Sequence, residues 1–191
     1  MPTGPNPIKI PAMTQTIFQT SLPGLLRIER PVRHDERGFF HEVVRPGELT
    51  ELTGKNFEVK QVNHSRSQKR VLRGLHAERW DKIVWIARGR AFSAIADIRP
   101  DSPTFGRYES FELSEDNGLA LYLPEGVANS IYALTDIDYI YLVNKVYDGS
   151  DTSAITWDDP DIAVAWPDTD PIISQRDRQN PRLRELFPER F

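Results

Sequence analysis

The stretch Lys82-Ile-Val-Trp-Ile-Ala87, followed by Arg88-Gly89-Arg90 and then by Ala91 to Ile98, sets the fold class of this chain. In its first part the odd and even positions separate, which is the pattern of a β-strand with two different faces. The glycine between two arginines indicates a tight turn, and the apolar residues after it indicate a second strand. The sequence therefore predicts a β-hairpin here.

The same pattern of short apolar runs broken by turn residues continues on both sides of this pair. Further strands are predicted at Tyr108–Leu113, Leu119–Leu123, Ser130–Leu134 and Asp138–Asn144. So many short strands favour a mainly β protein, a sandwich or jelly-roll β-barrel, over a parallel α/β sheet. Helical signals are confined to short peripheral segments at Pro46–Leu52 and Leu183–Phe187.

The length and composition fit one domain better than two. A chain of 191 residues, 39% of them hydrophobic, is long enough to bury a real core. We expect a single domain over residues 1–191, with an N-terminal arm at 1–20 and a barrel filling most of 21–150. The polar, proline-punctuated residues 151–191 are predicted to wrap the barrel.

Charge and cysteine content exclude several classes of function. The formal charge of −4 comes from 24 basic and 28 acidic residues with no basic stripe, so we expect no nucleic-acid partner. The chain has no cysteine, which excludes disulfides, thiolate metal sites and a cysteine nucleophile. The N-terminus lacks a signal peptide, and no apolar run reaches the roughly 20 residues that span a bilayer. We expect a cytoplasmic protein without a membrane partner.

Three chemically active side chains fall within one short apolar segment. Arg73, His76 and Lys82 supply a planar cation, a titratable imidazole and an ammonium. Arg73 fits a clamp on phosphate, His76 a proton carrier near neutral pH, and Lys82 a donor to a developing negative charge. A strand with an ordinary surface arginine and lysine and a hydrogen-bonded histidine explains these residues equally well.

No motif for a bound metal or a nucleotide cofactor is present. The four histidines include no His-x-His pair, which argues against a metal-binding barrel. Glycine-rich dinucleotide and phosphate-loop motifs are absent, as is the Gly-x-Ser-x-Gly element of many serine hydrolases. Cofactor-free acid and base chemistry, or simple binding, remains.

Later parts of the chain add candidate groups. Tyr139 and Tyr141 share one face of a strand, where they suit either a proton donor or an amphipathic core position. Tyr147 suits either stacking on a ligand or covering the barrel mouth. Asp177 follows an apolar pair and fits either a carboxylate that orients an imidazole or a solvated turn residue.

Together these segments resemble the dTDP-4-dehydrorhamnose 3,5-epimerase family. The matching pieces, in chain order, are Asp35-Glu-Arg-Gly-Phe-Phe40, Gln61-Val-Asn-His-Ser-Arg-Ser67, Val71-Leu-Arg-Gly-Leu-His76, Asp97-Ile-Arg-Pro-Asp-Ser-Pro-Thr-Phe-Gly106, Leu123-Pro-Glu-Gly126, Tyr141 and Ile173-Ser-Gln-Arg-Asp177. The resemblance implies a homodimeric jelly roll of the cupin type that works without metal or coenzyme. It also implies a deoxythymidine diphosphate-linked 4-keto-6-deoxy sugar as substrate.

The resemblance implies a role for individual residues. His76 corresponds to the base that removes the proton alpha to the ketone, Asp177 to the carboxylate that holds its ring, and Lys82 to the group that stabilises the enolate. Tyr141 corresponds to the acid that returns a proton from the opposite face. The substrate-binding positions it implies are Arg37, Glu42, Gln61, Asn63, Arg73, Asn129 and Tyr147.

Two positions depart from the family pattern. The family has His-x-Gln where this chain has His76-Ala-Glu78, and a histidine where it has Asn129; the segment from His76 to Lys82 is also short. A subset of the family shares these features. Because related enzymes stop after C3, these departures leave open a C3-only epimerase of a related nucleotide sugar. A non-catalytic sugar-nucleotide binding barrel also stays open, because a fold does not by itself fix function.

Overall fold

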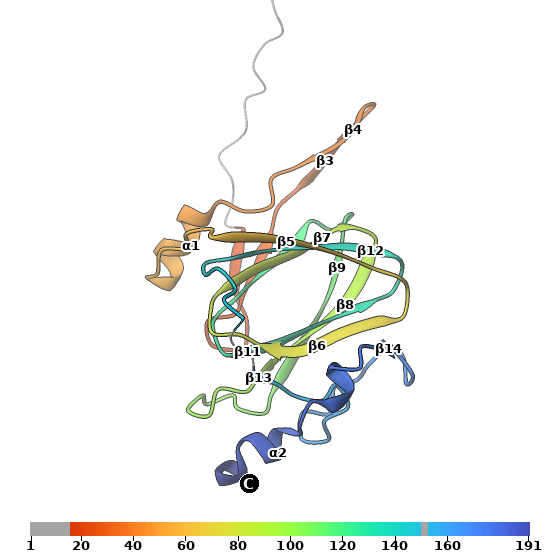
Figure 1. Ribbon diagram of the computed structural model, residues 1–191. Helices are drawn as coiled ribbons and strands as arrows, with labels where there is room; N and C mark the ends of the chain where they lie inside the picture. Colours follow the sequence, from red (N-terminus) through yellow and green to blue (C-terminus); the bar gives the residue numbers. More distant parts are fainter. Residues whose placement is uncertain (1–15, 150–152) are drawn as a thin grey trace, which may run out of the picture.

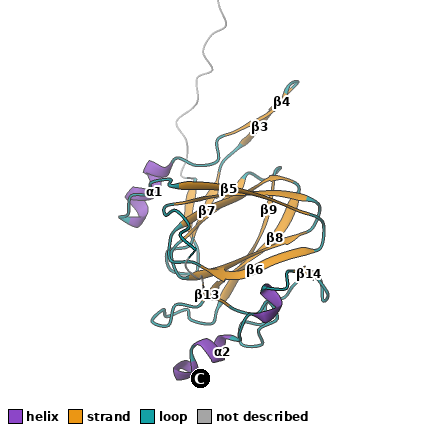
Figure 2. Ribbon diagram, viewed as in Figure 1, coloured by secondary structure: helices purple, strands orange, loops and turns teal. Residues whose placement is uncertain are grey.

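The computed structural model describes residues 16–149 and 153–191, and most of its regular structure is strand (Figures 1 and 2). A first six-stranded sheet has the order β1-β2-β10-β7-β12-β5. Its strands are β1 (Ile17–Gln19), β2 (Leu26–Glu29), β5 (Gln61–Ser67), β7 (Lys82–Arg88), β10 (Leu119–Leu123) and β12 (Ile137–Val143). Every pairing within this sheet is antiparallel.

A second sheet faces the first and has the order β13-β6-β11-β8-β9, with β14 pairing parallel to β6. Its strands are β6 (Val71–Ala77), β8 (Arg90–Asp97), β9 (Tyr108–Ser114), β11 (Val127–Ala133), β13 (Ser153–Ala154) and β14 (Ile172–Ile173). Two mainly antiparallel sheets with their inner faces together form a jelly-roll barrel, as predicted (Figure 1). The strands predicted after residue 107 are confirmed with small changes at their ends.

The predicted hairpin over Lys82–Ile98 is wrong, although both of its strands exist. The strand β7 pairs with β10 and β12, whereas β8 pairs with β9 and β11 in the opposite sheet. Gly89 alone joins the two strands, which is shorter than the two-residue loop of a tight hairpin. Its φ of 83° turns the chain from one sheet into the other, so this segment is a corner of the barrel.

The space between the sheets holds the main core. Inward-facing residues of β7 and β8 such as Val84, Ile86 and Ile95 pack with Leu121 and Ile131 from neighbouring strands. These side chains are at most 3% exposed, so β7 and β8 contribute to one core from opposite sides. Burying each such side chain contributes about 1.5–3 kcal/mol, which strongly favours the two-sheet arrangement.

Outside the barrel lie one hairpin and the predicted short helices. The strands β3 (Val32–Asp35) and β4 (Gly38–His41) form a two-stranded arm that projects from the barrel (Figure 1). Helix α1 (Pro46–Thr53) begins with Pro46, and Gly54 in the left-handed conformation ends it, as the sequence indicates. No helix of the described part of the chain is long and apolar enough to cross a membrane.

The C-terminal segment packs along β6. It contributes β13 and β14, then η1 (Asp177–Gln179), α2 (Leu183–Leu186) and η2 (Pro188–Arg190). Since β13 and β14 both pair with β6, the residues predicted to wrap the barrel hold Asp177 beside the middle of that strand. Residues 1–15 of the predicted N-terminal arm, and 150–152, lie outside the described residues, while Ile17–Gln19 form β1.

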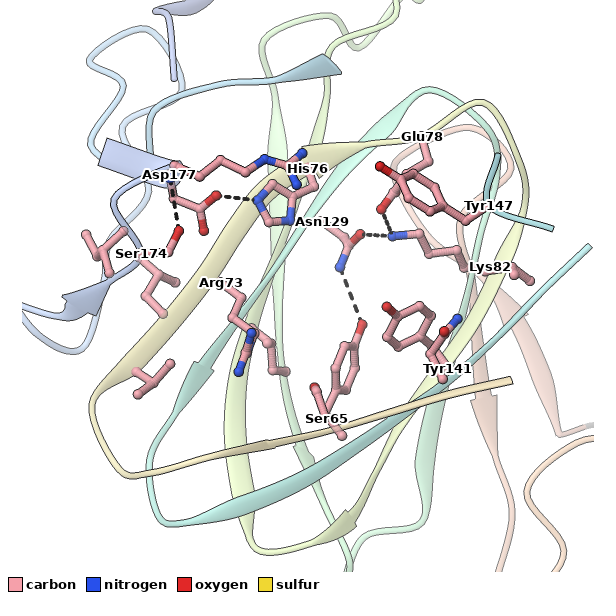
Figure 3. A pocket seen from close by; sticks show the side chains of 18 of the residues that line it. Ser65, Arg73, His76, Glu78, Lys82, Asn129, Tyr141, Tyr147, Ser174 and Asp177 are labelled. Carbon is pink, nitrogen blue, oxygen red and sulfur yellow. Dashed lines mark hydrogen bonds and ion pairs between the residues drawn. The ribbon is translucent and has the colours of Figure 1, made fainter. Parts of the chain in front are cut away.

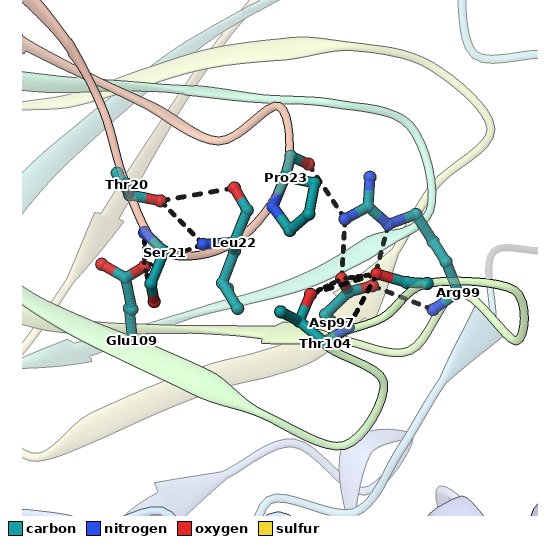
Figure 4. A network of polar contacts seen from close by, with 9 residues as sticks. Thr20, Ser21, Leu22, Pro23, Asp97, Arg99, Thr104 and Glu109 are labelled. Atoms are coloured by element: carbon teal, nitrogen blue, oxygen red, sulfur yellow. Dashed lines mark hydrogen bonds and ion pairs between the residues drawn. The ribbon is translucent and has the colours of Figure 1, made fainter.

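A polar network ties the chain after β1 to the second sheet (Figure 4). The Glu109 carboxylate accepts hydrogen bonds from the backbone N–H groups of Ser21 and Leu22. The Arg99 guanidinium donates to the Pro23 carbonyl at 3.0 Å and pairs with buried Asp97 at 2.7 Å. These bonds fix the entry of β2 and so help to close the barrel.

Candidate active site

A cavity of about 620 Å³ lies between the two sheets and is bounded by residues of β5, β6, β7, β11, β12 and the C-terminal segment (Figure 3). Nine of the eleven side chains that the sequence analysis proposes for the site line this cavity. They are Gln61, Asn63, Arg73, His76, Lys82, Asn129, Tyr141, Tyr147 and Asp177. Both sheets contribute, so a ligand inside it meets different groups on its two faces.

An irregularity in β6 brings two key side chains to the same cavity. Strand alternation alone would place Arg73 and His76 on opposite faces, because they are three residues apart. The register between β6 and β11 shifts opposite this point, and Gly74 between them has a φ of 129°. A Cβ on Gly74 would lie 2.6 Å from the Ser130 Cα, so only glycine allows this close approach of the strands.

His76 and Asp177 form a hydrogen-bonded dyad at one side of the cavity. The His76 Nε2 atom is 2.7 Å from the Asp177 Oδ1 atom, and the carboxylate is almost fully buried. Burial favours a raised pKa for Asp177, but hydrogen bonding from His76 and from the Gly74 N–H outweighs it and holds the pKa below its usual value. An ionised carboxylate can only accept, so Nε2 carries a proton and Nδ1 is the basic atom of neutral His76.

Lys82 lies on β7 with only 6% of its surface exposed. Its Nζ atom forms an ion pair with Glu78 and donates a hydrogen bond to the Asn129 Oδ1 atom at 2.8 Å. Burial lowers the pKa of Lys82, and the Glu78 carboxylate acts in the opposite direction. The Asn129 bond spans the two sheets, because Asn129 belongs to β11.

The two tyrosines of β12 lie side by side, as the sequence predicts for residues on one face. Their ring centroids are 5.4 Å apart, and both line the cavity. Burial raises the pKa of Tyr141, and more strongly that of Tyr139, so both hydroxyls keep their protons near neutral pH. The Lys82 Nζ atom lies 5.6 Å from the Tyr141 ring centroid, which places an ammonium beside a potential proton donor.

A polar rim closes the outer part of the cavity. Gln61 donates to the Asn63 side chain at 2.7 Å and accepts from the Tyr147 backbone N–H at 3.0 Å. The Tyr147 ring is half exposed and packs edge-on against Trp80. Arg73 lines the cavity, and its guanidinium donates hydrogen bonds to the Ser67 hydroxyl at 2.9 Å and to the Arg66 carbonyl at 3.3 Å.

Two of the residues expected to bind substrate do not line the cavity. Arg37 lies at the turn of the β3–β4 arm, where its exposed guanidinium pairs with Asp35 at 2.6 Å. Glu42 follows the arm and forms ion pairs with Arg30 and Arg45. Both therefore sit on or beside the projecting arm rather than at this chain's own cavity.

Some residues that line the cavity escaped the sequence analysis. Ser65 and Arg176 lie within two of the family-like segments, Gln61–Ser67 and Ile173–Asp177, and Trp80 lies in the short segment between His76 and Lys82. A basic residue beside a predicted carboxylate is the signal that could have marked Arg176. No three histidine, aspartate or glutamate side chains of residues 16–149 and 153–191 cluster so as to hold a metal ion.

The comparisons with known proteins agree with this geometry. A family model described as dTDP-4-dehydrorhamnose 3,5-epimerase matches residues 19–185. The chain belongs to this family. A dTDP-4-dehydrorhamnose 3,5-epimerase of Salmonella typhimurium is 37% identical over 177 residues, which is 90% of this chain and 97% of that protein. The predicted resemblance and the predicted jelly-roll class are thereby confirmed.

Two solved structures of similar proteins contain sugar nucleotides. A 3,5-epimerase of Legionella pneumophila, in complex with dTDP-4-keto-L-rhamnose, has a TM-score of 0.83 and 34% identity, covering 92% of this chain and 96% of that one. A 3'-monoepimerase of Streptomyces bikiniensis, in complex with dTDP-quinovose, also has a TM-score of 0.83, with 32% identity and coverage of 88% and 89%. Members of the same fold thus include both a double and a single epimerase.

Proposed function

We propose that this member of the family inverts C3 and C5 of dTDP-4-dehydro-6-deoxy-D-glucose to give dTDP-4-dehydro-L-rhamnose. The observation that carries the proposal is the placement of the His76–Asp177 dyad and of Tyr141 on opposite sheets around one cavity. Inversion needs a base on one face of the sugar ring and an acid on the other. The family membership of the chain supports the same activity.

The reaction begins with proton abstraction by His76. Its Nδ1 atom takes the proton from C3, the C–H electrons form a C3–C4 double bond, and the carbonyl electrons move to the C4 oxygen. Asp177 stabilises the imidazolium that results, and the Lys82 ammonium stabilises the enolate oxygen. Tyr141 then donates its proton to C3 from the opposite face as the C4 carbonyl re-forms. Once His76 has released its added proton to solvent and the Tyr141 phenolate has regained one from solvent, the same two steps at C5 complete the isomerisation.

The remaining lining residues position the nucleotide sugar. Arg73 suits the diphosphate because a guanidinium binds phosphate oxygens in a planar, bidentate way. Gln61 and Asn63 on the rim offer amide donors and acceptors to the sugar or nucleoside, and the Asn129 amide lies next to Lys82. The exposed ring of Tyr147 offers a stacking surface at the cavity mouth.

Deuterium exchange tests the activity directly. The protein is incubated with the 4-keto-6-deoxyglucose nucleotide in deuterated water, and C3 and C5 are followed by NMR. Deuterium at both carbons with formation of the rhamnose configuration is expected, and no exchange at either carbon would refute the proposal. His76→Ala is expected to lose deuterium exchange while still binding the nucleotide. If the protein is only a binding barrel, the parent protein itself will show no exchange.

Inversion at C3 alone is the second candidate. Its support is the similarity to the Streptomyces bikiniensis 3'-monoepimerase, together with Glu78 and Asn129 where the family pattern has glutamine and histidine. In the same assay, deuterium that enters only at C3 would establish this narrower activity.

The partner of this chain is proposed to be a second copy of itself. The β3–β4 arm presents Phe39 and Phe40, 52% and 66% exposed, and the edge strand β5 presents Val62, 61% exposed. An isolated two-stranded hairpin is only marginally stable in water, so this arm needs cover. In this homodimer the arm brings Arg37, with Glu42 at its base, to the cavity of the other copy and so adds a cation for the diphosphate.

Complementation between two variants tests this arrangement. Arg37→Ala and His76→Ala are each expected to lower turnover strongly. Mixing and refolding them together should restore part of the activity, because a mixed dimer then contains one site with both His76 and the partner's arm intact. If mixing restores nothing although sedimentation detects dimers, Arg37 does not serve the neighbouring site.

A further inference from the structure

The Glu78 carboxylate has no task in the reaction proposed above, yet it lies inside the cavity. It follows β6 directly, its side chain is 13% exposed, and it forms an ion pair with Lys82. Apart from Asp177, Glu78 is the one carboxylate among the described residues that line the cavity. A cavity that receives an anionic ligand gains no affinity from an added negative charge, so this carboxylate calls for another explanation.

We propose that Glu78 is a positioning residue that, together with Asn129, fixes the Lys82 ammonium in the cavity with one N–H group directed toward the substrate. This inference rests on the proposed epimerase activity. Glu78 reaches Lys82 from the end of β6, and Asn129 reaches it from β11 across the gap between the sheets.

The count of donors and acceptors supports this arrangement. An ammonium carries three N–H donors on a flexible four-carbon stem. Glu78 and Asn129 accept two of them, which restricts the stem and leaves the third for an oxygen of the ligand. An electrophilic group acts best when its donor already points to where negative charge develops, so this restriction favours the enolate.

The charges around Lys82 make Glu78 the group that keeps it cationic. From β6 the cavity receives Arg73 and His76, and from β12 it receives Tyr139 and Tyr141. Arg73 and His76 are not anions, and both tyrosines stay neutral near neutral pH because burial raises their pKa. The other carboxylate of the cavity, Asp177, is bonded to His76. Burial of Lys82 lowers its pKa and favours the neutral amine, and the adjacent Glu78 carboxylate opposes this effect and favours the ammonium.

Asn129 supplies the second acceptor without adding charge. Its Oδ1 atom accepts from Lys82, and its Nδ2 atom donates to the Tyr139 hydroxyl at 3.4 Å. A protonated histidine at this position would instead place a second cation beside the ammonium. Glu78 and Asn129, the two departures from the family pattern, therefore act on the same nitrogen atom.

Competitive lysine acetylation tests the inference without any substrate. The protein is treated with acetic anhydride over a pH series, and mass spectrometry gives the pH at which Lys82 is half reactive. In Glu78→Gln this pH should fall by about 1–3 units relative to the parent. Glu58→Gln is the matched control, because Glu58 pairs with Lys60 at the surface and lies outside the cavity. An unchanged Lys82 profile in Glu78→Gln would overturn the inference.

The deuterium-exchange rate across pH gives the second readout. As the pH rises, Glu78→Gln should lose activity at a lower pH than the parent does. Its main loss should be in kcat rather than in KM, and Glu78→Asp should keep part of the activity that Glu78→Gln loses. If the parent protein exchanges normally and Glu78→Gln loses its exchange activity at the same alkaline pH as the parent, the role of Glu78 is refuted and the proposed function stands. A parent protein without exchange would refute the proposed function, and the acetylation profile would still decide the role of Glu78.

Discussion

The His76 Nε2 atom lies 2.7 Å from the Asp177 Oδ1 atom, although the two residues are 101 positions apart. The pairing depends on the C-terminal segment, because β14 runs beside β6 and η1 begins at Asp177. The carboxylate therefore fixes the ring and selects the tautomer with a basic Nδ1 atom. The base of the proposed reaction is assembled from two distant parts of the chain.

Asp177→Asn is expected to lower kcat by about 10²–10⁴ with the fold intact. The amide can donate to Nε2, which would move the ring proton to Nδ1 and block the basic atom. Steady-state kinetics together with circular dichroism measure both effects. Asp161→Asn is the control, since Asp161 pairs with Arg184 outside the cavity. Equal turnover in parent and Asp177→Asn would remove the dyad from the mechanism.

Tyr141→Phe should separate proton abstraction from inversion. His76 and Asp177 remain, so the proton alpha to the ketone can still leave and a solvent deuteron can return on the same face. We expect deuterium incorporation to continue, while the rate at which the inverted product forms falls by about 10²-fold or by a larger factor. NMR of the recovered nucleotide sugar reports both quantities. If inversion persists at the parent rate, another group is the acid, and Tyr139→Phe would test its neighbour.

Gly89→Ala should destabilise the barrel at its corner. The positive φ of 83° is strained for alanine, and the added Cβ would meet the Asp136 backbone oxygen and the Thr135 hydroxyl. We expect the free energy of unfolding to fall by about 2 kcal/mol or more. Gly47→Ala in α1, where nothing lies within 4 Å, should be neutral or slightly stabilising. Thermal unfolding compares the two, and equal melting temperatures would contradict the strained corner.

The sequence predicts the strands well but their pairing poorly. The predicted strand Tyr108–Leu113 is one residue shorter than β9. The agreement is close because the alternation of apolar and polar residues that marks a strand is a local property of the sequence. Which strands pair is a property of the whole chain, so the pattern around Gly89 could not reveal that β7 and β8 belong to opposite sheets. The irregularity at Gly74 is also invisible locally, since it arises where β6 meets β11.

The candidate site divides in the same way. Arg73, His76 and Lys82 stand close in sequence, so their common chemistry could be recognised there. The position of Arg37 on a projecting arm depends on how β3 and β4 pair, and residue types alone do not determine it. The contact between Glu78 and Lys82 follows from the short turn between β6 and β7, which the sequence marks only as a shorter segment.

Asp138→Asn tests an ion-pair cluster away from the cavity. The Asp138 carboxylate on β12 binds Arg66 at 2.9 Å and His64 at 3.0 Å, both on the neighbouring edge strand β5. Hydrogen bonding from Arg66 and then from His64 lowers its pKa from 3.8 to about 2. Because the pKa is lower in the folded state, the carboxylate stabilises the fold above about pH 4 and this stabilisation is lost as the pH falls toward 2.

The variant should therefore melt at a lower temperature than the parent at pH 7, and the difference should shrink progressively between pH 5 and pH 3. Asp170→Asn serves as the control, because the Asp170 side chain is 95% exposed and should change little at any pH. Thermal unfolding by circular dichroism at each pH gives the comparison. A difference that stays constant from pH 7 to pH 3 would mean that packing of β12 against β5, rather than the charge of Asp138, holds this edge of the barrel.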